Sequence, residues 1–350
     1  MIKGFSKLTK EAKIEWLIAN YFNGEEKARE VLESYWHSDE KLQKLHDEFI
    51  ENTVSNFYMP MGIAPNFLIN GKEYAVPMVT EESSVVAAAA KSANFWADKG
   101  GFKATVKSTT KIGHVHFLWK GDNTDDLTSF IAGIVPKFYT ESNGITANMR
   151  KRGGGILAIQ LVDKTADIPH YYQLEAEFET CDSMGANFIN SCLEKFADVL
   201  KSEIANASLA VNEVEVVMCI LSNYTPKCLV KVEVSCPIAQ MVEGTDMSPQ
   251  AFAERFTTAV RIAETQPYRA VTHNKGIMNG IDALVLATGN DFRAIEACAH
   301  AYASKDGSYK SLTHCEVKDG HFRFWIELPL ALGTVGGLTS LHPLAKFSLQ

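Results

Sequence analysis

The chain has 350 residues, enough for two domains or for one domain with a large insertion. Its 34 basic and 42 acidic side chains give a net charge of −8 without any basic block, which excludes nucleic acid as a partner. No apolar run reaches the roughly 20 residues of a membrane span and the seven cysteines form no C-x-x-C pair, so we expect a soluble, cytoplasmic protein with reduced thiols.

The first hundred residues show signals for three helices and a hairpin. Thr9 can cap an amphipathic helix, and a second helix is predicted over 26–36. Two apolar pieces flank Asn70-Gly71, a dipeptide typical of a tight β-hairpin. From Thr80 an alanine-rich segment indicates a buried helix that is closed by a pair of glycines.

The middle of the chain alternates strand and helix patterns. A strand over 104–108 is predicted as a first hairpin arm, followed by β-α-β-β-α-β, an order typical of a ferredoxin-like domain. The segments after the arm are strand 114–119, a helix from 125, strands 156–162 and 172–179, helix 186–204 and strand 211–220. The remainder returns to long helices over 250–264 and 292–304. We therefore predict an α+β fold: a large, mainly helical domain (1–103 and 221–350) with an inserted antiparallel-sheet domain (104–220).

A polar cluster centred on Lys275 points to chemistry. The lysine is flanked by His273 and Asn274 and followed by Gly276 and Asn279, a set that is costly to fold unless the groups are used. An ammonium held in this way could stabilise negative charge that develops on a carbonyl oxygen. The alternative is an exposed loop lysine.

Two carboxylates, Glu82 and Asp291, are further candidate functional residues, and each has a plain structural alternative. Glu82 lies in the first turn of the predicted alanine-rich helix, where it could simply complement the helix dipole. Asp291 precedes a helical run and could equally be a plain N-cap.

Three further motifs could bind a ligand. The turn 182–187 joins a strand to a helix, and its glycine allows close approach to the helix N-terminus; an ordinary turn capped by Asp182 or Ser183 is the alternative. Residues 150–152, Arg-Lys-Arg, could meet a phosphate or form a solvated loop. His114 and His116 share a strand face, but no third ligand stands at metal-binding spacing, so we expect no metal site.

Taken in order, these segments resemble hydroxymethylglutaryl-CoA reductase of the class II, bacterial type, over nearly the whole chain. One short motif would be weak evidence, whereas so many in the same order are specific. The matching segments are Glu51-Asn52, 77–82 (PMVTEE), 182–187 (DSMGAN), 220–223 (ILSN), 268–282 (YRAVTHNKGIMNGID), 287–291 (ATGND) and 333–337 (GTVGG).

The resemblance implies a two-step reduction of hydroxymethylglutaryl-CoA, through a hemithioacetal and an aldehyde, to mevalonate and CoA. On the matching positions, Lys275 would stabilise the carbonyl oxygen and Glu82 would protonate it. Asp291 would lie between them, holding the lysine and tuning the glutamate. The residues implied to contact the substrate are Glu51, Asn52, Arg269 and Asn279.

The resemblance also implies a nicotinamide cofactor bound by the inserted domain. Its site would consist of Asp182, Ser183, Met184, Gly185, Ala186, Asn187 and Asn223. Some NADH-preferring relatives carry an acid ahead of the cofactor glycines; here Arg150 and Arg152 occupy that stretch and would attract a 2′-phosphate, so we expect NADPH rather than NADH. A homodimer with shared active sites, alone or in a larger assembly, and a biosynthetic role in the mevalonate pathway to isoprenoids are also implied.

Two departures from the family pattern bear on activity. Ser55 stands where the family usually has glycine, which affects local backbone geometry. The family ends in a mobile helical flap whose histidine protonates the CoA thiolate; the sequence stops before it, and His342 does not match that histidine. We therefore expect a chain that folds, dimerises and binds substrate and cofactor but turns over poorly. Two other classes remain open: a CoA-ester-binding module without turnover, and a lysine Schiff-base enzyme of the aldolase type.

Overall fold

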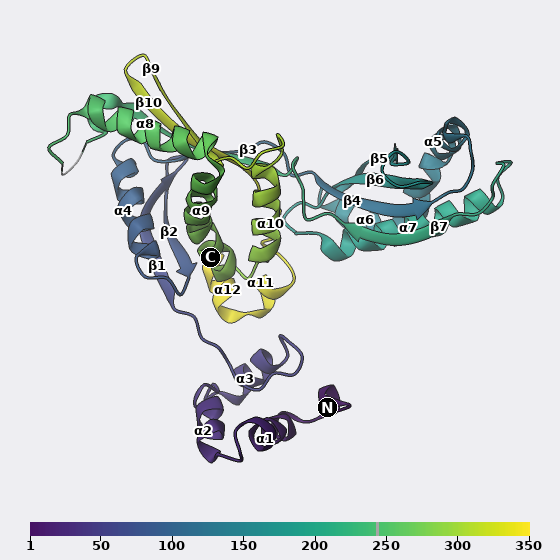
Figure 1. The fold of residues 1–350 in the computed structure, drawn as a ribbon, viewed down its shortest axis with the longest axis horizontal. Helices are drawn as coiled ribbons and strands as arrows, with labels where there is room; N and C mark the ends of the chain where they lie inside the picture. The colour runs from purple at the N-terminus through teal and green to yellow at the C-terminus, as the bar shows by residue number, and fades with distance from the viewer. Residues whose placement is uncertain (243–244) are drawn as a thin grey trace. The chain divides into compact units, whose positions relative to one another are not determined.

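The computed structural model describes residues 1–242 and 245–350, and the chain divides into two compact units, Met1–Pro60 and Met61–Gln350 (Figure 1). The first unit is helical, with α1 capped by Thr9, whose hydroxyl accepts a 3.2 Å hydrogen bond from the Ala12 amide. Its elements are the short 3-10 helix η1 (Phe5–Lys7), α1 (Lys10–Tyr21), α2 (Glu26–Ser34) and α3 (Glu40–Asp47). The two helices predicted from the sequence are present, and α3 is an addition to them.

The second unit begins with the predicted hairpin, β1 (Met61–Ile69) and β2 (Lys72–Val79). Asn70 and Gly71 adopt φ values of 50° and 80°, the left-handed conformation that a tight two-residue turn requires. Helix α4 (Val85–Ala97) packs against β1. This helix begins five residues later than the sequence indicated, because Ser84 is left-handed, with φ 70°.

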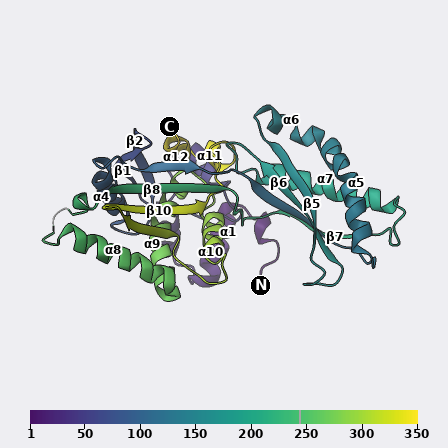
Figure 2. The same ribbon diagram turned by 90° about the horizontal axis from the view of Figure 1, so that it is seen from above.

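A four-stranded antiparallel sheet in the order β3-β8-β10-β9 forms the centre of the same unit. Its strands are β3 (Lys103–Val106), β8 (Leu229–Pro237), β9 (Thr313–Lys318) and β10 (His321–Pro329), with the 3-10 helix η2 (Ile238–Gln240) after β8. Helix α8 (Pro249–Thr265) packs against β9 and against α9 (Pro267–Ala287), which in turn contacts α10 (Phe292–Ala303) (Figure 2). Two short helices, α11 (Leu338–Leu341) and α12 (Pro343–Ser348), follow.

Three strands of this sheet, β8, β9 and β10, were not predicted from the sequence, and the fourth, β3, was predicted with the wrong partner. The segment expected as a first hairpin arm is β3, and it pairs with β8 rather than with the strand that follows it in the chain. The amides of Lys107 and Ser108 still bond to the carbonyl of Leu229 in β8, so the chain leaves this sheet only after residue 108. Strand propensity locates a strand, whereas its partner depends on long-range packing.

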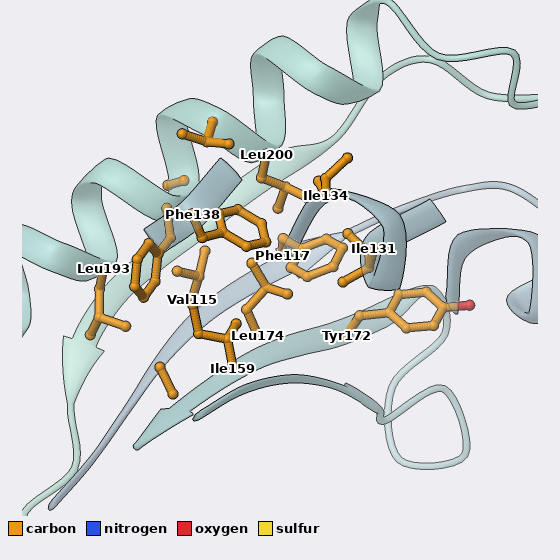
Figure 3. Close-up of a cluster of buried hydrophobic side chains, with 14 of the residues drawn as sticks. Val115, Phe117, Ile131, Ile134, Phe138, Ile159, Tyr172, Leu174, Leu193 and Leu200 are labelled. Atoms are coloured by element: carbon orange, nitrogen blue, oxygen red, sulfur yellow. The ribbon is translucent and has the colours of Figure 1, made fainter. Parts of the chain in front are cut away.

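A second four-stranded antiparallel sheet, in the order β5-β6-β4-β7, has the predicted ferredoxin-like topology. Its elements are β4 (Lys111–Leu118), α5 (Thr124–Glu141), α6 (Asn143–Lys151), β5 (Gly155–Asp163), β6 (Tyr171–Glu179), α7 (Ala186–Ala205) and β7 (Glu215–Leu221). Alternate side chains of β4 and β6 point into a core with α5 and α7, where Phe117, Phe138 and Leu174 are fully buried (Figure 3). The predicted α+β class is thus confirmed.

In the described part of the chain, no helix combines the length and apolar character needed to cross a bilayer. All seven cysteines are free thiols.

Candidate active site

Helix α9 carries the central polar cluster. Pro267 occupies its first turn, where a missing N–H costs nothing, and Ala270, Asn274 and Met278 are buried at the spacing of one helical face. Lys275 therefore lies on a regular helix, which corrects the alternative of a loop lysine. Gly276 has no atom within 4 Å of the position of an added Cβ, so the surface beside the lysine is open.

Lys275 and Glu82 form an ion pair in which the lysine Nζ lies 2.6 Å from a glutamate Oε. Glu82 is in the loop between β2 and α4, three residues before the helix, and not in its first turn as expected; its amide bonds to the Thr80 hydroxyl. The side chains are 62% and 45% exposed. An exposed pair contributes only about 0–1 kcal/mol to stability, so the fold does not depend on this contact.

Asp291 is the N-cap of α10, the alternative left open by the sequence. One of its oxygens accepts hydrogen bonds from the amides of Arg293 and Ala294 at 3.0 and 3.2 Å, and the carboxylate pairs with the Arg293 guanidinium. Partial burial acts to raise the pKa of Asp291, but the hydrogen bonds from Arg293 and the two amides outweigh it and lower the pKa. Among the described residues, no ion pair joins Asp291 to Lys275, and the expected contact between the two stays a prediction.

The other predicted substrate residues fall on two units. Asn279 follows Lys275 by one turn and shares its face of α9, while Arg269 is exposed near the start of the helix. Glu51 and Asn52 lie in the first unit after α3; both are exposed and Asn52 has φ 60°.

His273 and Asn274, which flank the lysine, have structural partners. The buried Asn274 amide donates to the Lys310 carbonyl at 2.9 Å and accepts from the Leu312 amide at 3.0 Å, which ties α9 to the segment before β9. His273 bonds to the Thr313 hydroxyl at 2.6 Å, and burial together with the charge of Arg269 lowers its pKa. These bonds fix the rotation of α9 and therefore the direction in which Lys275 points.

The turn 182–187 joins β6 to α7. Gly185 is the N-cap of α7 with φ 85° and provides no side-chain cap, and among the described residues neither Asp182 nor Ser183 bonds through its side chain to the first amides of the helix. An added Cβ at Gly185 would lie 2.4 Å from Thr180, and one at Gly333 would lie 2.7 Å from the Met184 amide nitrogen. The uncapped N–H groups and positive end of the α7 dipole suit an anionic group such as a pyrophosphate.

The basic segment 150–152 ends α6 beside this turn. The Cys181 thiol donates a 3.2 Å hydrogen bond to the Arg152 carbonyl, which brings the end of α6 against the start of the turn. Both arginines are exposed, and Arg150 bonds through its guanidinium to Asn143 at 2.6 Å.

A small cavity of about 10 Å³, large enough for about one water molecule, opens where the β5-β6-β4-β7 sheet meets α10. Its polar lining includes Asn223, predicted from the sequence, and Lys111, which was not predicted. Lys111 is only 4% exposed; its ammonium lies 3.4 Å from the Thr109 carbonyl and has no ion pair among the residues described. The sequence contained a signal for this burial. Side chains alternate along β4, and Lys111 is in the same set as the buried Val115 and Phe117.

The two strand histidines are engaged with neighbours on β6. His114 lies 3.3 Å from Glu175, and His116 bonds to the Tyr171 hydroxyl at 2.7 Å. Within residues 1–242 and 245–350, no group of three potential ligands is arranged to hold a metal ion.

Comparison with known proteins identifies a family for the chain. The family model for hydroxymethylglutaryl-coenzyme A reductase matches residues 13–350. The 3-hydroxy-3-methylglutaryl-coenzyme A reductase of Archaeoglobus fulgidus is 34% identical over 351 residues, covering 100% of this chain and 76% of the relative. A probable reductase of Borreliella burgdorferi is 32% identical over 86% of this chain and 66% of its own length.

A solved structure of the class II reductase from Streptococcus pneumoniae, bound to NADPH in open conformations, superposes with a TM-score of 0.80 at 34% identity, covering 99% of this chain and 90% of that one. The fold and the matches define the chain as one of the NAD(P)H-dependent oxidoreductases. It belongs to the hydroxymethylglutaryl-coenzyme A reductase family. The resemblance predicted from the sequence, the enzyme class and the use of a nicotinamide cofactor are confirmed.

Proposed function

We propose that this chain catalyses the reduction of hydroxymethylglutaryl-CoA to mevalonate and free CoA, with two molecules of reduced nicotinamide cofactor consumed. The single observation that supports the assignment to this site is the 2.6 Å contact between Lys275 and Glu82. It joins a cation suited to a developing oxyanion with a group suited to proton transfer, on an open face of α9.

A bound reduced nicotinamide would supply one hydride in each of two steps. The first hydride adds to the thioester carbonyl carbon. The hemithioacetal then loses its hydroxyl proton and its C–S bond breaks, which releases a CoA thiolate that takes a proton from solvent, and the second hydride adds to the carbon of the resulting aldehyde. Lys275 donates hydrogen bonds to the carbonyl oxygen as it gains charge. Glu82, in its protonated form, gives that oxygen a proton. It is then reprotonated from solvent, to which its side chain is 45% exposed. Asp291 holds the lysine in this scheme, which requires its carboxylate to exchange the Arg293 guanidinium for Lys275.

For substrate binding we assign Arg269 to the free carboxylate of the hydroxymethylglutaryl group, because an exposed guanidinium pairs bidentately with a carboxylate. We assign Asn279, which follows Lys275 by one turn of α9, to a hydroxyl or carbonyl of the same group. Glu51 and Asn52 are assigned to the thioester end on family resemblance.

For the cofactor we assign the turn 182–187 and Asn223, supported by the uncapped N-terminus of α7 and the close approach that Gly185 and Gly333 permit. Arg150 and Arg152 are assigned to a 2′-phosphate, so NADPH is the preferred cofactor. Support for this choice comes from Arg152, which is exposed and whose backbone carbonyl is held next to the turn by the Cys181 thiol.

In this proposal, residues 1–103 and 221–350 form the substrate domain and 104–220 the cofactor domain, except that β3 belongs to the sheet of the former. A homodimer is supported by apolar side chains that are 41–60% exposed on α11 and α12, namely Leu338, Leu341, Leu344 and Phe347. The seven free thiols support a reducing compartment, the cytoplasm, as the location of the protein. Mevalonate would then be formed in the cytoplasm.

The direct test is oxidation of NADPH, followed by loss of its absorbance, on addition of hydroxymethylglutaryl-CoA, with mevalonate identified as the product. Absence of substrate-dependent oxidation, both with the thioester and with mevaldehyde, would refute the proposal. If the protein binds the thioester tightly without any hydride transfer, a CoA-ester-binding module is the better description. Borohydride trapping of a carbonyl substrate on Lys275 would instead favour a Schiff-base enzyme.

A further inference from the structure

Asp282 and Glu296 form a pair of carboxyl groups between α9 and α10. Asp282 lies two turns after Lys275 on α9, and Glu296 lies in the second turn of α10, which Asp291 caps. The side chain of Glu296 is within hydrogen-bonding reach of Asp282. The pair therefore joins the two helices that carry Lys275 and Asp291.

One oxygen of Asp282 cannot be satisfied if both groups are ionised. Oδ1 is buried and has no hydrogen-bond donor among the described residues. A carboxylate only accepts, so two ionised groups at this distance leave the atom unpaired and repel each other. A proton held between them removes both penalties, because one carboxyl then donates to the other.

No cation offers an alternative partner in the described parts of the chain. The neighbouring cations on the same helices are already paired, Lys275 with Glu82 and Arg293 with Asp291. Glu264 of α8 pairs with His314, and His300 of α10 bonds to Tyr309. On the other elements packed against α9, charged side chains such as Lys72 of β2, Lys91 of α4, Arg261 of α8 and Lys346 of α12 are exposed.

We propose that Asp282 and Glu296 share a single proton and act as positioning residues, a carboxyl clasp that fixes α9 to α10 and so sets Lys275 relative to Asp291. The inference rests on the proposed function for its consequence in catalysis, but the clasp itself does not.

The clasp weakens as pH rises. Burial, the charge of Glu296 and hydrogen bonding to it raise the pKa of Asp282 from 3.8 to about 7. Because the folded pKa is raised above the unfolded one, the stabilisation by the shared proton is fully present below about pH 4 and is lost as pH rises through about 7. Above that value two like charges face each other between the helices.

The test compares wild type with Asp282→Asn, whose amide donates to Glu296 at every pH, and with Glu296→Gln as an independent second variant. Asp126→Asn, an exposed acid on α5, is the matched control. Thermal unfolding is measured from pH 4.5 to 8.5 without ligands. As pH rises from 4.5 to 8.5, we expect the unfolding temperature of wild type to fall by at least about 2 °C more than that of either clasp variant. The unfolding temperature of the control should change with pH as that of wild type does.

Reductase turnover is then measured over the same range. The ratio of wild-type to Asp282→Asn kcat should fall at least about 3-fold between pH 6 and 8.5. Parallel unfolding curves for wild type and both variants would overturn the clasp, even if the protein proves to have no reductase activity. Divergent unfolding curves with a constant kcat ratio would overturn the positioning role. Failure of the reductase assignment alone leaves the unfolding result intact, so the two failures are distinguishable.

Discussion

Glu82 and Lys275 meet at 2.6 Å although 193 positions separate them in the chain. The loop after β2 brings one and the middle of α9 the other, and β2 packs directly against α9. Because the pair is exposed, its contribution to folding is about 0–1 kcal/mol, and changes to it can be read as changes in chemistry.

Lys275→Met should abolish most turnover while the protein remains folded. Loss of the cation that stabilises the oxyanion is expected to lower kcat roughly 10²–10³-fold. The thermal midpoint should remain within about 2 °C of wild type. Lys164→Met, which removes another exposed lysine paired with an acid, is the control and should retain full activity. Equal activity of the two variants would remove Lys275 from the mechanism.

Glu82→Gln tests the proton donor. The amide keeps the size and a hydrogen bond but cannot give a proton, so we expect kcat to fall roughly 10²-fold or more with substrate affinity unchanged. Steady-state kinetics and calorimetric titration of hydroxymethylglutaryl-CoA measure the two quantities. Glu81→Gln, the exposed neighbour in the same loop, is the control and should behave as wild type. A variant that loses binding instead of turnover would reassign Glu82 to substrate recognition.

Arg152→Ser tests the cofactor choice. Removal of one charge-assisted bond to a 2′-phosphate should reduce kcat/KM with NADPH roughly 10-fold and leave the value with NADH unchanged. Arg261→Ser on α8 removes the same charge elsewhere and should change neither. If Arg152→Ser lowers kcat/KM equally with NADPH and NADH, the arginine does not recognise the 2′-phosphate.

Gly185→Ala separates backbone strain from close packing at the cofactor turn. Gly185 and Gly307 both have φ 85°, but only Gly185 has a neighbour where the new Cβ would lie, at 2.4 Å from Thr180. We expect Gly307→Ala to cost about 1 kcal/mol and Gly185→Ala about 2 kcal/mol or more, by denaturant unfolding. Only Gly185→Ala should raise the KM for NADPH. An equal effect of both substitutions on that KM would argue against the turn as the cofactor site.

Local signals in the sequence identified the parts of the fold that local physics determines. The Asn70-Gly71 turn, the Thr9 cap and the alternation along β6 each depend on residues close in the chain. The pairing of β3 with β8 joins residues more than a hundred positions apart, and no short pattern encodes it. β9 and β10, by contrast, form a hairpin around Asp319-Gly320, a local turn signal that the prediction overlooked.

The site divides in the same way. Residue types identified Lys275 and Glu82, whereas the position of Glu82 ahead of α4 follows from the left-handed Ser84, a conformation that serine rarely adopts. Asp291 was found as a candidate, but its bond to Arg293, only two residues away, competes with the expected lysine. Lys111 escaped notice because a lysine on a strand usually faces solvent.

The chain enters and leaves the ferredoxin-like segment at neighbouring positions, at one end of the β4–β7 ladder. Gly113 and Leu221 are partners across it, and the Ser222 amide bonds to the Ile112 carbonyl, so the incoming and outgoing chains stand next to each other. A short bridge between residues 110 and 223 would therefore close the gap left by excision of everything between them. The segment can therefore be exchanged as one unit without lengthening the chain on either side.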